Sequence, residues 1–261
     1  MPHNLSKVLF SFIFFALSLF VTMNVQARQL QFIGSAFDLE TGKLVYTEKH
    51  IVTLDEAGNY VRTDVRYVGV DGQVISTKTL DFSMNELAPQ LAFDDPRNNL
   101  SYKTTLSPEY LVLETQAGAE TETNVIEVSG NNIVVDAGFD RMLLQHWDTL
   151  LAGNDQLFDF LALTRGSTIE FTLSTVSTSD TEVRFKIEPS NWFIRILMDP
   201  IVLDYDVKTK RLMRYEGITN IAKDGGDSNY SAIIEYRYIE EPSDLVVGDS
   251  MPSLEEKQRA L

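Results

Sequence analysis

The chain has 261 residues, no cysteine and a formal net charge of −16 at pH 7, from 38 acidic and 22 basic side chains. This acidic excess disfavours binding to nucleic acid or to an anionic membrane face, because like charges repel. The absence of cysteine excludes disulfides, thiol catalysis, thiolate metal sites and a lipidated N-terminal cysteine. Stability must therefore come from a buried core, and the length suits one large β domain or two small ones.

Residues 1–27 have the pattern of a cleaved signal peptide. Lys7 supplies the positive charge, an uncharged apolar run covers residues 8–21, and Val25-Gln26-Ala27 offers small residues for cleavage. An uncleaved anchor is the less favoured alternative, because the run is shorter than the roughly 18 to 20 apolar residues that span a bilayer. No later stretch of the sequence is apolar enough to span a membrane. We therefore expect an exported, periplasmic protein that is neither lipidated nor membrane-spanning after cleavage.

From Gln29 onward apolar residues recur with a period of two, which predicts β-strands. Turn signals such as Asp71-Gly72 separate neighbouring strands and favour antiparallel hairpins. Residues 84–99 contain two prolines and are interpreted as a crossing loop, either alone or with a helical turn. The apolar residues 191–198 are interpreted as a strand or a short helix. The predicted strands cover residues 32–37, 43–53, 59–68, 73–82, 100–105, 110–115, 124–128, 133–135, 169–174, 183–188, 201–206, 211–217 and 231–239.

Residues 136–153, DAGFDRMLLQHWDTLLAG, form the one amphipathic helix that the sequence predicts beyond the signal peptide. Asp136 is expected to cap its start, and Gly153 suits its C-terminal cap. An apolar stripe of this width needs a sheet to pack on. The residues that share the apolar face by helical spacing are Phe139, Leu143, Trp147, Leu150 and Leu151.

These elements together predict a mainly β fold. We expect an antiparallel curved sheet, a half-barrel or a barrel, packed on the central helix 136–153. One domain would span residues 28–240. The remaining residues, 241–261, are acidic and are predicted to form a frayed tail.

The sequence carries no established catalytic motif. It lacks a GxSxG nucleophile turn, an HExxH pair, a calcium-binding loop and a phosphate-binding glycine loop. Beyond the signal peptide its histidines are His50 and His146, which would need a carboxylate to complete a zinc site. We therefore expect no enzymatic activity, no metal and no cofactor. The alternative is a hydrolase that uses Tyr46, Glu48 and His50, which share one strand face, although a period of two does not tell which face is buried.

A single helix cannot fill the interior of a large curved sheet, so we expect an apolar cavity between them. The function predicted from this cavity is non-catalytic binding or carriage of a hydrophobic ligand, such as a lipid or acyl chain. The alternative is an envelope scaffold or assembly factor that contacts a partner protein through a strand edge. The residues predicted to line the ligand site are Tyr46, Leu143, Trp147, Leu151, Phe171 and Phe185.

The overall layout also resembles known proteins. A signal peptide, strands, a helix bearing Trp147 and closing hairpins that contain YDVKTKRLMRYEG at 205–217 resemble uncharacterised Gram-negative envelope proteins classed as domains of unknown function. The architecture is similar to the unclosed β-barrel of periplasmic lipoprotein and lipid carriers, which bind acyl chains between a curved sheet and helices. The resemblance covers residues 30–240 and rests on layout rather than on a signature motif. It therefore implies a fold and a ligand class, and it assigns no functional residue.

Overall fold

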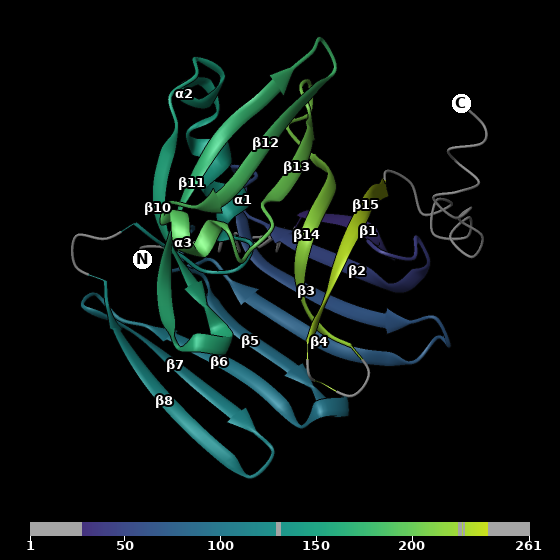
Figure 1. The fold of residues 1–261 in the computed structure, drawn as a ribbon, viewed down its shortest axis with the longest axis vertical. Helices are drawn as coiled ribbons and strands as arrows, with labels where there is room; N and C mark the ends of the chain where they lie inside the picture. The colour runs from purple at the N-terminus through teal and green to yellow at the C-terminus, as the bar shows by residue number, and fades with distance from the viewer. Residues whose placement is uncertain (1–27, 129–131, 224–225, 227, 240–261) are drawn as a thin grey trace, which may run out of the picture.

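A computed structural model describes residues 28–128, 132–223, 226 and 228–239, and its strands form one 15-stranded sheet (Figure 1). The predicted signal peptide 1–27 and tail 241–261 lie outside the described residues. The strands are β1 (Arg28–Asp38), β2 (Leu44–Leu54), β3 (Tyr60–Gly69), β4 (Val74–Asp81), β5 (Gln90–Asp95), β6 (Leu100–Leu106), β7 (Tyr110–Ala117), β8 (Glu120–Glu127), β9 (Ile133–Val134), β10 (Gln156–Ala162), β11 (Ser167–Thr178), β12 (Glu182–Pro189), β13 (Ile201–Asp206), β14 (Leu212–Ala222) and β15 (Asn229–Ile239). The helices are α1 (Gly138–Gln145), α2 (Trp147–Leu151) and α3 (Trp192–Arg195), with 3-10 turns η1 (Pro96–Asn98) and η2 (Leu163–Arg165).

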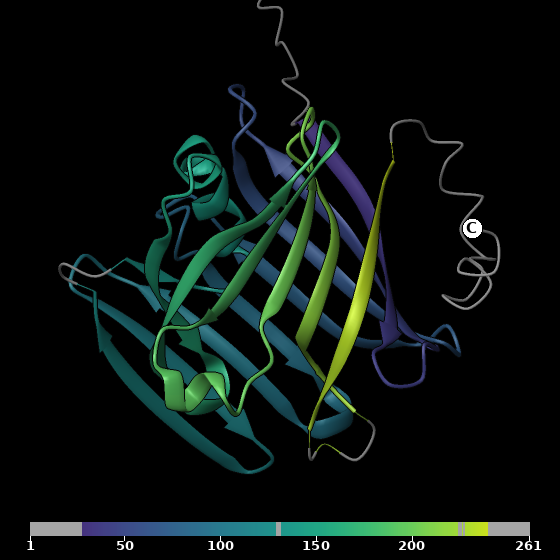
Figure 2. The ribbon, with the colours of Figure 1, turned by 45° about the horizontal axis from the view of Figure 1, so that its top comes forward.

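The sheet consists of two antiparallel meanders. Strands β1 to β8 pair in chain order, strands β10 to β15 do the same, and β1 pairs with β15 to join the two. The short strand β9 pairs in parallel with β10. The second meander, green to yellow, crosses in front of the first, purple to blue-green, so that the sheet folds over on itself (Figures 1 and 2). The predicted mainly β fold with an antiparallel curved sheet is confirmed.

The sheet is not closed. Strands β8 and β9 lie at its two ends, and no strand pairing joins them within the described residues. The two meanders nevertheless approach each other at this side. Gly166, which begins the turn into β11, lies against the Asn124 side chain of β8, so closely that a Cβ at Gly166 would meet Asn124 Oδ1 at 2.2 Å. The interior is therefore covered by sheet on both sides while one seam stays unpaired.

Two local predictions were wrong. The predicted continuous helix 136–153 is two short helices, because His146 has φ −102° and ψ 13°, outside the helical range, and ends α1 before α2 begins. The crossing loop predicted at 84–99 contains the strand β5, which was not predicted. The helical turn offered for this segment is confirmed as η1, where Asp95 accepts a hydrogen bond from Arg97 N. Strand β10 was not predicted, and the open alternative at 191–198 is resolved as the helix α3.

The interior contains two apolar clusters, which meet at β9. Successive strand residues point to opposite faces, so Ile133 joins the first cluster and Val134 the second. The second, here called the helix-side core, lies between α1, α2 and strands β10 to β13. In it the Trp147 ring packs edge-on against Phe185 and Tyr205, at centroid distances of 5.4 and 5.9 Å. The buried residues of the helix-side core are Val134, Met142, Leu143, Trp147, Leu150, Phe158, Phe171, Leu173, Val183, Phe185, Ile187, Leu203 and Tyr205.

Candidate functional site: a polar centre inside an apolar cavity

A cavity of about 260 Å³ lies between the two meanders. It is nearly twice as large as the roughly 150 Å³ engineered apolar cavity that binds benzene in another protein, so it has room for on the order of ten non-hydrogen atoms. Most of its wall is apolar or aromatic. Side chains of this kind include Phe32, Val52, Phe139, Phe158, Phe160, Ile169, Phe171, Ile187, Met198, Ile201, Leu212, Ile218, Ile221 and Ile234.

A row of facing residues across four strands builds the first part of the polar centre. Gly34 of β1 lies opposite Tyr236 of β15 on one side and opposite Glu48 of β2 on the other, and Glu48 lies opposite Tyr67 of β3. Because Gly34 has no side chain, the Tyr236 hydroxyl reaches across β1 and donates to Glu48 Oε2 at 3.2 Å. A Cβ at Gly34 would lie 2.8 Å from the Tyr236 ring and 3.1 Å from Glu48 Oε2. The glycine therefore makes room for this contact.

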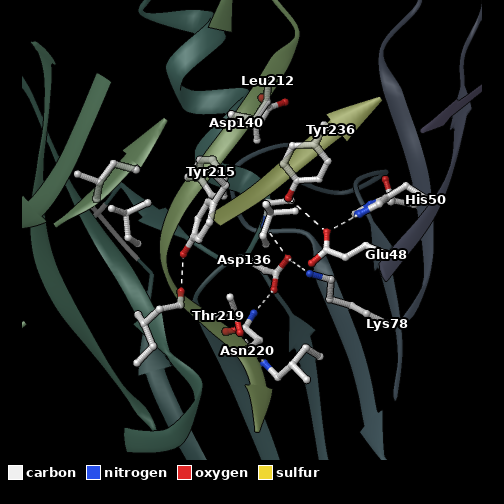
Figure 3. Close-up of a pocket in the computed structure, with 18 of the residues that line it drawn as sticks. Glu48, His50, Lys78, Asp136, Asp140, Leu212, Tyr215, Thr219, Asn220 and Tyr236 are labelled. Atoms are coloured by element: carbon white, nitrogen blue, oxygen red, sulfur yellow. Dashed lines mark hydrogen bonds and ion pairs between the residues drawn. The ribbon is translucent and has the colours of Figure 1, made fainter. Parts of the chain in front are cut away.

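Glu48 also pairs with His50, two residues along the same face of β2. His50 Nε2 lies 2.8 Å from Glu48 Oε2, and the side chains are only 11% and 7% exposed (Figure 3). The imidazole stacks on the Phe32 ring of the neighbouring strand at a centroid distance of 4.3 Å. The strand face that carries Tyr46, Glu48 and His50 thus points into the cavity, which the sequence pattern left open.

Asp136 forms the second part of the polar centre and links the two meanders. Lys78 Nζ of β4 donates to Asp136 Oδ1 at 2.7 Å, and Asn220 Nδ2 of β14 donates to Asp136 Oδ2 at 2.8 Å (Figure 3). The backbone N–H of Ala137 donates to Oδ1 as well, at 2.8 Å. Both carboxylate oxygens are therefore occupied, and the prediction that Asp136 caps the helix was wrong, since α1 has no side-chain cap.

The backbone before α1 explains this orientation of Asp136. The residue has φ 46°, in the left-handed region that aspartate adopts more readily than most residues. Val135 N donates to Leu87 O at 2.9 Å, and Gly138 lies so close to the same carbonyl that a Cβ there would approach it to 1.9 Å. The loop around Leu87 therefore holds the turn that presents Asp136 to the cavity.

Burial controls the protonation of the groups around the centre. Burial raises the pKa of Tyr67, Tyr215 and Tyr236 above the usual value, so these hydroxyls stay protonated at neutral pH. For Lys78, burial alone would lower the pKa, but the attraction of Asp136 outweighs it and the pKa is raised. Lys78 is therefore a permanent cation, unsuited to act as an amine nucleophile.

Tyr46 differs from the other tyrosines of the centre. It is 0% exposed, and among the described residues its hydroxyl makes no hydrogen bond of normal geometry. Burial raises the pKa of Tyr46 well above its usual value, and Glu48 raises it further, while the nearby Thr219 side chain acts in the opposite direction. The phenol is thus neutral and buried, and the nearby Thr219 side chain does not satisfy it with a hydrogen bond of normal geometry.

The structure places some of the residues predicted to bind ligand on the cavity wall and the others elsewhere. Tyr46 and Phe171 line the cavity. Leu143, Trp147 and Phe185 are buried in the helix-side core instead and are absent from the cavity wall. Leu151 is 39% exposed on α2. Leu143, Trp147 and Leu151 were placed on the ligand wall because the prediction assumed that the apolar face of one helix points into the cavity. Phe185 was placed there as an apolar residue of a predicted strand, 183–188.

The arrangement of Glu48 and His50 has clear chemical limits. A carboxylate that holds an imidazole can orient it for proton transfer. A hydrolase would also need a nucleophile, and Tyr46, the third residue of that hypothesis, is held in its protonated form by burial. The described residues contain no group of three or more histidine and carboxylate side chains placed to hold a metal ion.

Sequence reasoning missed Lys78, Asn220 and Gly34 as members of the site. Lys78 and Asp136 are 58 residues apart, so only the fold brings them together. Gly34 did carry a signal, because a glycine within an apolar strand pattern often marks the close approach of another group.

Comparisons of the chain with protein-family models, with curated proteins and with solved structures find no match. The resemblance to envelope proteins and lipid carriers therefore stays a prediction. None of the described helices has the length and apolar character needed to cross a bilayer.

Proposed function

We propose that this protein is a non-catalytic periplasmic binding protein that holds the apolar part of a hydrophobic ligand, such as a lipid or acyl chain, between its two meanders. The observation that carries the proposal is the apolar cavity of about 260 Å³. Ligand sites in proteins are mostly apolar concavities with a few polar groups that fix orientation, and this cavity has that composition. A ligand with an apolar body and a polar end would match both parts of the wall.

The first test is native mass spectrometry, combined with organic extraction, of protein purified from periplasm without detergent. A discrete co-purifying mass of lipid size supports the proposal and identifies the ligand class. The proposal is contradicted if the protein has the mass of the chain alone and takes up neither added lipid nor a neutral naphthylamine probe.

A variant that fills the cavity sharpens the test. Ala162 lines the cavity, so Ala162→Trp should add a large side chain to the space and abolish probe uptake. Ala152, at the end of α2, is exposed, and Ala152→Trp serves as the matched control that should leave uptake unchanged. Equal uptake by both variants would place the probe outside the cavity.

The scaffold hypothesis remains the second candidate, because β8 is an end strand of the sheet and pairs with β7 alone among the described strands. Its edge offers backbone groups to an added strand. Three glutamates, Glu120, Glu122 and Glu127, lie on this strand and are exposed, which is how natural proteins discourage such pairing. A proline at exposed Thr123 that abolishes partner capture but preserves ligand uptake would favour this second function.

A further inference from the structure

The acidic and basic side chains around the cavity already have partners. Lys78 lies 2.7 Å from Asp136, and His50 lies 2.8 Å from Glu48, with each of these side chains at least 89% buried. The remaining acid of the wall, Asp140, accepts a hydrogen bond from the Tyr205 hydroxyl at 2.7 Å. No partner is therefore left over for a charged ligand, and an ion taken from water into such a site without a partner is strongly disfavoured.

A charged ligand would also meet repulsion. An anionic head would approach Glu48 and Asp136, and a cationic head would approach Lys78. The two acid–base pairs face the same space, so a charged head of either sign meets carboxylates and an ammonium that already have partners (Figure 3). The electrostatics therefore favour a head that is polar but uncharged.

The free hydrogen-bonding capacity lies at Tyr46. Nearly all buried polar groups in folded proteins have a hydrogen-bond partner, and the Tyr46 hydroxyl is an exception among the described residues. Thr219, which also lines the cavity, carries its hydroxyl near that of Tyr46. A phenol and an alcohol side by side supply donors and acceptors but no charge, as an uncharged head requires.

We propose that Tyr46 and Thr219 form the head-group subsite of the cavity, and that its ligand carries an uncharged head with a hydroxyl or carbonyl oxygen on an apolar body of about ten non-hydrogen atoms inside the cavity. This inference rests on the proposed function, since it names the ligand class for the same cavity. The Tyr46 hydroxyl donates to the head oxygen. A long-chain alcohol or an acylglycerol has the required chemistry, whereas a fatty-acid anion and an alkylammonium do not.

The test compares ligands of equal chain length that differ in the head. Displacement of a neutral naphthylamine probe is measured for decanol, decanoate and decyltrimethylammonium, with butylbenzene as a ligand that has no polar head. We expect decanol to bind the wild-type protein more tightly than either ion. Tyr46→Phe removes one hydroxyl and keeps the ring, so it should weaken decanol binding about two- to tenfold and leave butylbenzene binding unchanged.

The same substitution has a second, opposite effect that a purely structural hydroxyl would not produce. Because Tyr46→Phe removes a buried polar group without a partner, the melting temperature of the ligand-free protein should rise. Ser76→Ala is the matched control: it removes a buried hydroxyl that donates to the backbone carbonyl of Asp94 at 2.7 Å, from a side chain outside the cavity wall. It should lower the melting temperature and leave both ligands' affinities unchanged.

The outcomes separate the two proposals. Failure of all four compounds to displace the probe would overturn the proposed function and this inference with it. If butylbenzene binds, and decanoate or decyltrimethylammonium binds at least as tightly as decanol does, the inference alone would be overturned. Unchanged decanol affinity in Tyr46→Phe would likewise remove Tyr46 from the subsite while the cavity function stands.

Discussion

The helix-side core and the polar centre of the cavity lie in the same folded sheet but differ in whether a buried tyrosine hydroxyl has a hydrogen-bond partner. In the helix-side core, Tyr205 is fully buried and its hydroxyl donates to Asp140 at 2.7 Å. In the cavity, Tyr46 is equally buried and its hydroxyl has no such partner. Two tyrosines of equal burial therefore differ in the one property that matters for an additional ligand.

The two regions also differ in what fills them. Around Trp147 the space is occupied by aromatic and aliphatic side chains from two helices and five strands. Around Glu48 and Lys78 the sheet leaves about 260 Å³ of space and places buried acid–base pairs at its wall. Empty volume and buried charge both lower stability relative to a filled apolar core. We infer that the helix-side core stabilises the fold and that the cavity is kept for another purpose.

The largest expected effect is that of Trp147→Ala. The indole is 4% exposed and packs on Phe185 and Tyr205, so truncation should lower the free energy of unfolding by about 3–5 kcal/mol. Since Trp147 is not on the cavity wall, the affinity of the folded fraction for a cavity ligand should not change. Urea unfolding and probe titration under native conditions measure the two quantities. Lost affinity with unchanged stability would place Trp147 in the ligand site after all.

The next effect concerns the Lys78–Asp136 pair, which connects the meanders at the cavity. Removing one partner leaves the other charge buried and unpaired, so Lys78→Met and Asp136→Asn should each lower the free energy of unfolding by about 3–5 kcal/mol. Asparagine tolerates the left-handed backbone of residue 136, so Asp136→Asn tests charge rather than strain.

A double-mutant cycle separates this pair from its surroundings. The variant with both substitutions should lose much less stability than the two single losses added together, because it leaves no uncompensated charge. The cycle is measured by urea unfolding of all four proteins at neutral pH. Simple additivity would mean that the two charges do not stabilise each other.

The sequence predicted the fold class well and the site in part, for physical reasons. Strands such as β2 and β12 alternate between buried and more exposed residues, and this period of two can be recognised in the local sequence. The antiparallel sheet could therefore be predicted from it. The same period placed Tyr46, Glu48 and His50 on one face. It did not predict that Glu48 and His50 would be buried, because burial of these residues depends on partners from other strands, among them Tyr236 and Phe32.

Asp136 illustrates the limit of local reasoning. An aspartate just before an amphipathic stretch is typical of a helix cap, and that interpretation uses only neighbouring residues. In the fold, Lys78 of β4 and Asn220 of β14 both donate to this carboxylate, so it does not cap the helix. His146 shows the same limit. The apolar periodicity of residues 136–153 continues across it, but the helical backbone conformation does not.

The smallest predicted effect tests the boundary between the two regions, at Asp140. Burial raises the pKa of Asp140, against the opposing hydrogen bond from Tyr205, so the folded state holds this proton more tightly than the unfolded chain does. The wild-type protein therefore gains stability from Asp140 as pH falls through the raised pKa, and at neutral pH the buried carboxylate is a net cost.

Asp140→Asn keeps an oxygen that accepts from Tyr205 and removes the charge, so it should be more stable than wild type at neutral pH. That advantage should shrink toward about pH 4, where the wild-type carboxyl is protonated. Melting temperatures of both proteins across this range measure the effect, and a variant less stable than wild type at neutral pH would show that the charge strengthens the Tyr205 hydrogen bond by more than its burial costs.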